Sequence, residues 1–257
     1  MLNKNTLFIG KVLLEFDSLP STNLFALELL SKSKPSEGTV ILAFDQSEGR
    51  GQIGSRWESQ PGCNITLSVI LYPTFLPIPQ QFSLNQASAL AVRDFVARYA
   101  KKPVYVKWPN DIYIGHCKVA GILIQNTLSG GGFQSAVIGL GINVNQEIFA
   151  PGLPNPTSLK LETDLEFELP ELIQRLCQDL EQRYLQLRNS QFGRLNEEYL
   201  QYLYGLGQTA LFERPDGQQF SGMITGVSPI GLLLVEAGGK EEAFQLKEIK
   251  MVSPPQI

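Results

Sequence analysis

The chain has 257 residues and a net charge of −4, with 43% hydrophobic and 18% charged residues. This composition supports one large folded domain, or a large domain with a small one, and excludes global disorder. The acidic balance and the lack of a basic tract argue against binding to a nucleic-acid backbone. No apolar run has the length of a membrane span and residues 1–10 show no signal-peptide pattern, so we expect a cytoplasmic protein.

Cysteine and histidine are too few for several kinds of site. Cys63, Cys117 and Cys177 are scattered and odd in number, which does not suggest a disulfide framework. With His116 as the only histidine, a zinc site or a Ser-His-Asp triad has little to build on. If the protein is an enzyme, we expect it to work with Lys, Arg and carboxylate groups, by positioning and charge.

Over most of the chain, the spacing of apolar residues predicts strands interrupted by amphipathic helices. In chain order we expect strand 7–17, helix 24–30, strands 39–44 and 65–72, helix 83–99, strands 104–108, 111–114, 119–125 and 136–144, and helices 169–187 and 192–203. In the strand over 65–72, alternate apolar residues share one face and Ser68 faces the other way. Ser83 and Gln86 have the spacing of a capping box at the start of their helix.

The last strand of this series differs between its two faces. Ile138, Leu140, Ile142 and Val144 form one face, and the other consists of Gly139, Gly141, Asn143 and Asn145. A face without side chains beside a polar amide is where a ligand can lie flat against the backbone. The structural alternative is a barrel bend or a bulge with glycine at it.

After Gly205 and Gly207 the composition changes to short strands separated by turn signals. The expected strands are 210–214, 219–227, 232–236 and 243–252. This pattern is typical of a small SH3-like β-barrel. We therefore predict a large domain over residues 1–205 and a second domain over residues 206–257.

The loop Ser47–Trp57 carries three glycines, two arginines and a tryptophan, with almost no residue that could form a core. Glycine allows close approach of the backbone to a ligand, and arginine offers a fork of donors to carboxylate or phosphate. Trp57 adds a flat face for a base or a ring. The loop therefore predicts a mobile lid over an anionic ligand, and a surface turn with solvated charges is the alternative.

The segment Lys107–Asp111 ends a predicted strand at a proline. Asn110 can donate and accept hydrogen bonds, which suits an adenine edge or a ribose. Asp111 can hold Mg²⁺ or orient a donor. The alternative is a capped β-turn, because Pro-Asn-Asp is favourable turn chemistry.

Lys118 begins the next predicted strand and is either a solvated edge charge or a group that reaches into a site. Strict alternation would place Gly121 and Leu123 on the face opposite Lys118 unless a bulge intervenes. The sequence therefore defines no common ligand face here.

Together these features suit a reaction that brings two anions together, such as attack of a carboxylate on the α-phosphate of ATP. Fixed positive charge offsets the repulsion between the anions and stabilises the charge that develops on the phosphoryl oxygens. The GxxxxGK[ST] phosphate loop is absent, which fits attack at the α-phosphate better than an ordinary P-loop kinase.

The chain resembles the biotin–protein ligases (biotin–[acetyl-CoA-carboxylase] ligases) from about residue 18 to residue 145. The matching motifs are Ser21-Thr22-Asn23, Gln46, Gly49-Arg50-Gly51, Gly54 to Trp57, Lys107 to Asp111, Lys118 to Leu123 and Gly139-Leu140-Gly141-Ile142-Asn143. The resemblance implies an α+β fold with a mixed or antiparallel catalytic sheet of the biotin/lipoate ligase type, similar to class II synthetases. The carboxy-terminal barrel fits the same family.

The resemblance also implies an ATP-dependent ligase that works in two steps. Biotin and MgATP give biotinyl-5′-AMP and pyrophosphate, and a lysine of a carrier protein then attacks the mixed anhydride. The implied partner is the biotin carboxyl carrier protein of acetyl-CoA carboxylase, and a homodimer is left open. Mg²⁺ is expected with ATP rather than at a fixed protein site, with Asp111 as a candidate contact. We expect neither a DNA-binding domain nor operator binding.

By matched position, the resemblance assigns candidate roles to individual residues. The catalytic residues would be Lys118 and Arg50. Biotin would be bound by Ser21, Thr22, Asn23, Gln46, Arg50, Gly51, Gln52, Lys118, Gly121 and Leu123. The adenylate side would use Trp57, Asn110, Asp111 and Asn143.

Four alternative functions remain at this point. A nucleic-acid binder that uses the carboxy-terminal barrel is disfavoured by the acidic balance of the chain. A lipoate or other acyl-acid ligase would share the fold, although Gln46 and the Ser21-Thr22-Asn23 cluster weakly favour a ureido ring over a dithiolane. A related acyltransferase would need a cysteine nucleophile, and Cys117 has no neighbour in sequence except lysine to lower its pKa. A non-catalytic binding module is disfavoured by Lys118, Arg50 and Asn110 occurring together.

One departure from the family pattern generates a prediction. Gln52 and Ser55 stand where the family loop often has basic residues. Because fewer charges then cover the acyl-adenylate, we expect it to leave the enzyme faster than it leaves more basic relatives. A chase experiment on the enzyme-bound adenylate measures this rate, and a long-lived complex would contradict the expectation.

Overall fold

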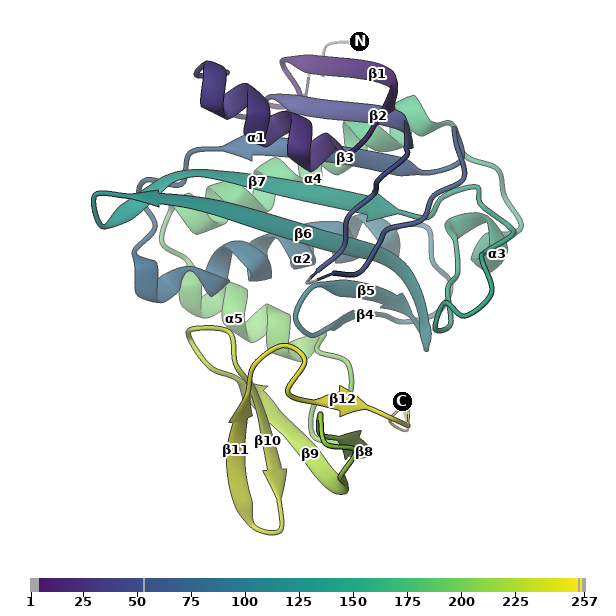
Figure 1. Ribbon diagram of the computed structural model, residues 1–257, viewed down its shortest axis with the longest axis vertical. Helices are drawn as coiled ribbons and strands as arrows, with labels where there is room; N and C mark the ends of the chain where they lie inside the picture. The colour runs from purple at the N-terminus through teal and green to yellow at the C-terminus, as the bar shows by residue number, and fades with distance from the viewer. Residues whose placement is uncertain (1–4, 53, 254, 256–257) are drawn as a thin grey trace.

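The computed structural model describes residues 5–52, 54–253 and 255 (Figure 1). None of the described helices combines the length and the apolar character needed to cross a bilayer. The elements of the larger part are β1 (Leu13–Leu19), α1 (Thr22–Lys32), β2 (Val40–Gln46), β3 (Ile65–Leu71), the 3₁₀ helix η1 (Ile78–Gln80), α2 (Phe82–Ala97), β4 (Val104–Lys107), β5 (Asp111–Ile114), β6 (Cys117–Ser129), β7 (Gly132–Ile142), α3 (Leu159–Thr163), α4 (Leu169–Arg188) and α5 (Phe192–Gln201).

A seven-stranded mixed sheet forms the centre of this part, in the order β1-β2-β3-β7-β6-β5-β4. β1 runs parallel to β2, and the other neighbouring strands are antiparallel. Helices α2 and α4 lie behind the sheet, α5 packs against these two helices, and α1 lies in front of the sheet (Figure 1). This arrangement confirms the predicted α+β class with a mixed sheet.

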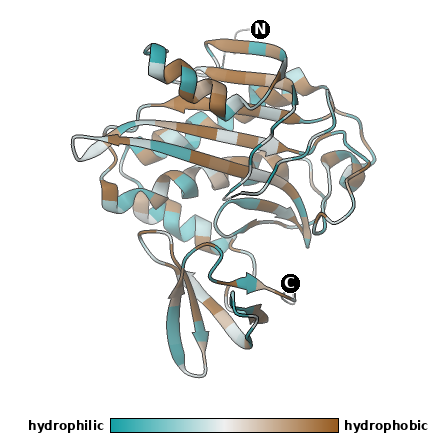
Figure 2. Cartoon of the chain, viewed as in Figure 1, coloured by the Kyte–Doolittle hydropathy of each residue, from teal (hydrophilic) through white to brown (hydrophobic). Residues whose placement is uncertain are grey.

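The sheet separates two apolar cores. Ile65, Leu67, Val69 and Leu71 of β3 belong to the larger core, which also contains buried residues of α2 and α4. Ile70 belongs to a smaller core beneath α1. Where α1 covers the front face, β2 and β3 are buried on both sides and read as almost continuous apolar runs, which appear brown in Figure 2.

Helix α1 covers only part of the front face. Its buried residue Ala26 belongs to the same cluster as Ile41 and Ala43 of β2, Ile70 of β3 and Val137 of β7. Beyond the helix, the loop between β2 and β3 crosses in front of β7 and β6 (Figure 1). The uncovered part of the front face therefore lies beneath this loop.

The remaining strands form a separate five-stranded antiparallel sheet, β11-β10-β9-β8-β12, below α5 in Figure 1. Its strands are β8 (Thr209–Glu213), β9 (Gln219–Val227), β10 (Leu233–Ala237), β11 (Lys240–Phe244) and β12 (Lys250–Met251). This sheet confirms the predicted small β domain. It contacts the larger part where the indole N–H of Trp108 donates to the Gly231 carbonyl at 2.9 Å.

The strand predicted over 7–17 begins six residues later, at Leu13. The backbone N–H groups of Leu7, Phe8 and Ile9 donate instead to the Glu181 carboxylate, at 2.5, 2.7 and 2.9 Å. A carboxylate on α4 therefore satisfies the donors that a neighbouring strand would otherwise take.

The predicted capping box is wrong. Helix α2 begins at Phe82, so Ser83 is already inside its first turn and bonds Gln80. Gln86 donates to Asn196 of α5 at 2.9 Å. The same sequence spacing thus serves helix packing instead of a helix cap.

The strand predicted over 243–252 is also wrong as a single element. It is divided between β11 and β12 by a turn over 245–249. Lys247 in that turn has a φ of +71°, a left-handed conformation that no continuous strand accommodates.

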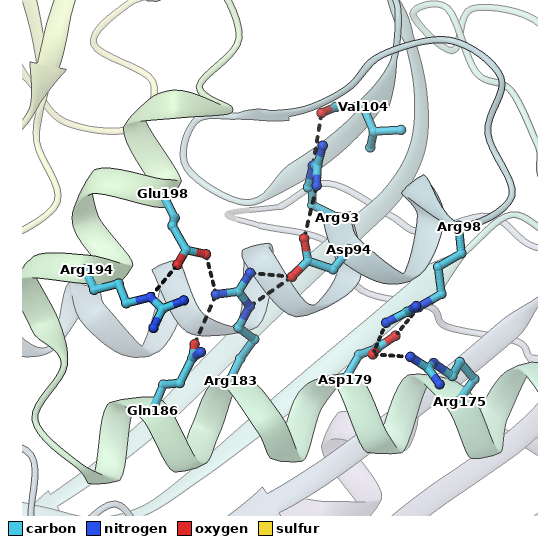
Figure 3. A network of polar contacts seen from close by, with 10 residues as sticks. All are labelled: Arg93, Asp94, Arg98, Val104, Arg175, Asp179, Arg183, Gln186, Arg194 and Glu198. Atoms are coloured by element: carbon cyan, nitrogen blue, oxygen red, sulfur yellow. Dashed lines mark hydrogen bonds and ion pairs between the residues drawn. The ribbon is translucent and has the colours of Figure 1, made fainter.

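Charged side chains connect the helices behind the sheet (Figure 3). Arg183 of α4 is 12% exposed and bonds Asp94 of α2 at 2.5 and 2.9 Å. It also bonds Glu198 of α5 at 2.5 Å. Separately, Arg98 and Arg175 both contact Asp179. Arg183 is the one member of these groups that joins three helices.

We predict that Arg183→Met lowers the free energy of unfolding by about 2 kcal/mol, because it leaves two partly buried carboxylates without their shared partner. Urea denaturation measures the effect. The control is Lys32→Met, which removes a pair between side chains that are 69% and 61% exposed and should leave the midpoint unchanged. Equal effects of the two substitutions would contradict a structural role for the Arg183 network.

Candidate active site

A cavity of about 550 Å³ opens on the front face, beneath the loop between β2 and β3. Every residue to which the resemblance assigned a role lines it. Asn145, which the sequence placed on the glycine face, bonds the Phe167 backbone instead and does not line the cavity. Ile53 of the predicted lid lies outside the described residues. Those lining residues are Ser21, Thr22, Asn23, Gln46, Arg50, Gly51, Gln52, Trp57, Asn110, Asp111, Lys118, Gly121, Leu123 and Asn143. Residues distributed over more than a hundred positions of the chain therefore meet in one place.

One end of the cavity is a polar pocket at the start of α1. The backbone N–H of Thr22 donates to Gln46 Oε1 at 2.8 Å. The Asn23 carboxamide bonds the Leu123 carbonyl at 3.3 Å and Gln125 Oε1 at 3.0 Å. Thr22 and Asn23 are both 3% exposed, so the ends of these hydrogen bonds on α1 are buried. This end can recognise a small polar ring through fixed donors and acceptors.

The floor of the cavity is backbone. Gly121 of β6 pairs directly with Gly141 of β7, and Leu123 pairs with Gly139. The indole of Trp57 lies on this floor, so close that a β-carbon at Gly141 would lie 2.3 Å from the ring. The Trp57 Nε1 atom is buried without a hydrogen-bond partner among the described residues. The predicted glycine face is thus a flat surface that accepts a ring.

Lys118 lies on the same side of β6 as Gly121 and Leu123, which resolves the question that the sequence left open. The pairing of β5 with β6 shifts between Ile112 and Tyr113, whose partners are Ala120 and Lys118. The residue between those partners, Val119, is therefore an extra residue of a β-bulge. Because Val119 and Ala120 both point into the core, the strand faces exchange and Lys118 reaches the cavity.

In the cavity, the Lys118 ammonium lies 2.7 Å from Asp111 Oδ2, and their side chains are 28% and 30% exposed. A second ammonium, that of Lys107, is close enough to affect the same charges. Burial lowers the pKa of Lys107, Asp111 opposes this shift, and Lys118 adds to it. Two lysines therefore stand around one carboxylate, which leaves net positive charge available for anions.

Asn110 and Asn143 enter the cavity with part of each carboxamide already engaged. Asn110 is 5% exposed and its Nδ2 donates to the Ile122 carbonyl, so its oxygen remains for a ligand. Asn143 Nδ2 donates to the Thr157 carbonyl at 2.9 Å. Asn143 Oδ1 is buried without a partner among the described residues. An exocyclic amine of a base could donate to that oxygen.

The loop above the cavity folds back on itself. Arg50 and Arg56 face each other in a short antiparallel bridge, and Gly51 N–H donates to the Ser55 carbonyl at 2.8 Å. The Ser55 hydroxyl donates to the Gln52 carbonyl at 2.5 Å. Ser55 therefore closes the turn that carries Arg50 over the cavity.

The buried side chain of Gln146 contacts both the chain that follows the lid and the segment after β7. Gln146, 5% exposed, accepts from the backbone N–H of Gln60 at 3.0 Å through Oε1. Its Nε2 group donates to the Ile148 carbonyl at 2.9 Å. The returning arm of the lid and the segment after β7 are therefore tied to each other.

Sequence reasoning missed the residues that complete the far wall. These are Phe149, Leu153, Pro154 and Pro156 after β7, and Leu246 and Lys247 from the small β domain. The prolines marked only an irregular connection, and no spacing connects residues 246–247 with the glycine strands. The position of residues 246–247 at the cavity depends on how the two sheets pack against each other.

His116 and Cys117 do not line the cavity. His116 Nδ1 lies 2.7 Å from the Tyr204 hydroxyl. Burial, followed by the charge of Glu162, raises the pKa of the Cys117 thiol, although Lys102 opposes the shift. A thiol with a raised pKa carries little thiolate, so Cys117 is not set up as a nucleophile.

Comparisons with known proteins show which family the whole chain resembles. The bifunctional ligase/repressor BirA of Bacillus subtilis is 32% identical over 231 residues, which are 89% of this chain and 70% of that protein. The biotin–[acetyl-CoA-carboxylase] ligase of Mycobacterium tuberculosis is 31% identical over 226 residues, covering 86% and 81% of the two chains.

The fold has a counterpart in the biotin protein ligase from Aquifex aeolicus, solved in complex with biotin and ATP. The two superpose with a TM-score of 0.77 at 24% identity, over 93% of this chain and 98% of that one. Residues 15–143 match the model of the biotin/lipoate A/B protein ligase family. This chain belongs to the biotin/lipoate A/B protein ligase family.

Proposed function

We propose that this protein is an ATP-dependent biotin–protein ligase. It condenses biotin with ATP to biotinyl-5′-AMP and pyrophosphate, and then transfers the biotinyl group to a lysine of a carrier domain. The observation that carries the proposal is one cavity whose lining combines the polar pocket, the charged residues Lys118 and Arg50, and the glycine floor on which the Trp57 indole lies. The relatives named as biotin ligases support the choice of substrate.

In the first step, a biotin carboxylate oxygen attacks the α-phosphorus of ATP, and the bond to the bridging oxygen of pyrophosphate breaks. Both reactants are anions, so positive charge must offset their repulsion before the chemistry begins. Lys118 and Arg50, which both line the cavity, supply that charge. The ring of biotin occupies the polar pocket at Thr22, Asn23 and Gln46.

The nucleotide uses the other side of the cavity. Trp57 offers a face for stacking, and the unpartnered Asn143 Oδ1 accepts from the adenine amino group. Asn110 contributes its remaining carboxamide oxygen. Gly51 and Gln52 cover the phosphate from the lid through their backbone.

Asp111 changes partner in this scheme. Without substrate, Lys118 pairs with the Asp111 carboxylate. When the substrate anions attract Lys118, Asp111 loses this partner and its carboxylate lies beside the reacting atoms. There it can help hold the Mg²⁺ that accompanies ATP, or accept a proton from the acceptor lysine. The lysine amine then attacks the carbonyl of the mixed anhydride and AMP leaves.

The proposal extends to the partner and the organisation of the chain. The carrier is the biotin carboxyl carrier protein of acetyl-CoA carboxylase, in the cytoplasm where ATP is available. The catalytic domain comprises residues 1–205 and the small domain residues 206–257; the start of β8 at Thr209 supports this boundary. A homodimer is the assembly that we would test first by light scattering.

One prediction from the proposed function concerns substrate choice. Pyrophosphate release in the presence of MgATP should require biotin and should not occur with lipoate. Lys118→Ala should lower kcat/KM for biotin by about 10²–10³-fold, the effect of removing one charged stabilising group. Lys102→Ala is the matched control, because Lys102 pairs with Glu162 and does not line the cavity.

Release with lipoate would keep the fold and the chemistry but overturn the assignment of the polar pocket. Release with neither acid would favour a binding module. Full activity of Lys118→Ala would remove Lys118 from the mechanism.

The second prediction concerns the glycine floor. Gly141→Ala places a β-carbon 2.3 Å from the Trp57 ring, so the indole must leave the floor. We expect KM for ATP to rise at least about tenfold and tryptophan emission to shift to longer wavelength. Gly193→Ala, where a β-carbon meets no atom within 4 Å, should change neither. An unchanged KM for Gly141→Ala would show that the floor does not receive a ring.

A further inference from the structure

We propose that Ser68 and Gln125, which do not line the cavity, determine the hydrogen-bonding polarity of the pocket and restrict it to a ring that donates an N–H group and presents a carbonyl oxygen. Both residues lie behind the polar pocket, Ser68 on β3 and Gln125 on β6. The inference rests on the proposed function and identifies residues that would select its substrate.

The hydrogen bonds of Asn23 fix the orientation of its carboxamide. Its Nδ2 group carries two hydrogens and meets two acceptors, the Leu123 carbonyl and Gln125 Oε1. Its Oδ1 atom lies 2.5 Å from the Ser68 hydroxyl oxygen. Since Oδ1 can only accept, the Ser68 hydroxyl must donate to it.

The hydrogen bond from Ser68 to Asn23 determines the role of Thr22. The Ser68 hydroxyl has one hydrogen, and it is already used on Asn23. At the 2.7 Å contact between Ser68 and Thr22, Ser68 can therefore only accept. The Thr22 hydroxyl donates either there or to Gln46 Oε1, which lies 3.2 Å away. In both cases Thr22 presents only lone pairs to a ligand.

The same counting of donors and acceptors fixes the orientation of the Gln46 carboxamide. Its Oε1 accepts the backbone N–H of Thr22 at 2.8 Å, so that oxygen points toward α1. The Nε2 group is then the part of the carboxamide that a ligand can use, and it is a donor. The pocket therefore offers an acceptor at Thr22 and a donor at Gln46.

Packing prevents the network from rearranging. Ser68 is fully buried and stands opposite Gly139 in the pairing of β3 with β7. A β-carbon at Gly139 would lie 2.1 Å from Asn23 Oδ1, so the Asn23 carboxamide fills the space that this glycine leaves. Leu123, whose carbonyl Asn23 binds, flanks Gly139 on the other side. The Asn23 carboxamide is thus held between three strands.

A cyclic urea matches this pattern. Its N–H donates to Thr22 and its carbonyl oxygen accepts from Gln46. A dithiolane ring offers neither group and would leave the buried Thr22 and the half-buried Gln46 unpaired, which a site built on hydrogen bonds penalises strongly. The selection would therefore originate one layer behind the residues that touch the ring.

The test compares biotin with its two cyclic carbamate analogues, in which one or the other ring N–H is replaced by oxygen. Calorimetry on the full chain measures each dissociation constant. The wild type should bind biotin at least about tenfold more tightly than the analogue that loses the N–H facing Thr22. In Ser68→Ala that preference should fall to within about threefold, because Asn23 and Thr22 lose their fixed orientation. KM for ATP should stay unchanged.

The matched control is Ser88→Ala, which removes another buried serine hydroxyl, one that donates to a backbone carbonyl within α2. It should keep the full preference for biotin. Gln125→Met is a second variant; by removing the acceptor of Asn23 Nδ2 it should reduce the preference in the same way.

Two outcomes overturn the inference while leaving the proposed function standing. In one, Ser68→Ala and Gln125→Met keep the wild-type preference. In the other, they weaken biotin and the analogues equally, as a purely structural role would. A wild type that binds neither biotin nor its analogues would overturn the proposed function, and the inference with it.

Discussion

The pairing of β6 with β7 is the constraint on which the rest of the site depends. It places Gly121 opposite Gly141 and Leu123 opposite Gly139. On the reverse side, the same ladder buries Ile122 and the apolar residues of β7 in the main core. Because strand faces alternate with a period of two, a slip by one residue would place apolar side chains in the cavity and glycines in the core. The core therefore fixes the register that creates the floor.

The bulge at Val119 brings Lys118 to the same side of β6 as the glycine floor. In a regular strand Lys118 would share a face with Ala120 and Ile122, and its ammonium would point into apolar packing, where an unpaired charge is very costly. The extra residue turns the lysine toward Asp111 instead. One irregularity in the ladder thus lets a buried strand deliver a charge to its open face.

The periodicity of apolar residues was enough to predict the main strands and the two faces of β3 and β7. Alternate residues of a strand face opposite sides of the sheet, so the side that packs in the core is apolar in the sequence. It failed where a side chain from elsewhere satisfied the backbone. Glu181 takes the donors of residues 7–9, and Gln86 bonds α5 instead of capping its own helix. The site motifs were predicted as separate segments, but the bulge that aligns Lys118 with Gly121 leaves no signal in composition.

The small β domain shows a second limit of sequence reasoning, because it helps to build the site. The segment from Lys107 to Asp111 is held from two directions: Trp108 donates to Gly231 of that domain, and the Tyr199 hydroxyl of α5 donates to the Pro109 carbonyl at 3.1 Å. Residues 246–247 of the same domain line the cavity. A displacement of the domain would therefore move both the far wall and the turn that carries Asp111. The two sheets therefore line one cavity together, although their sequences read as independent domains.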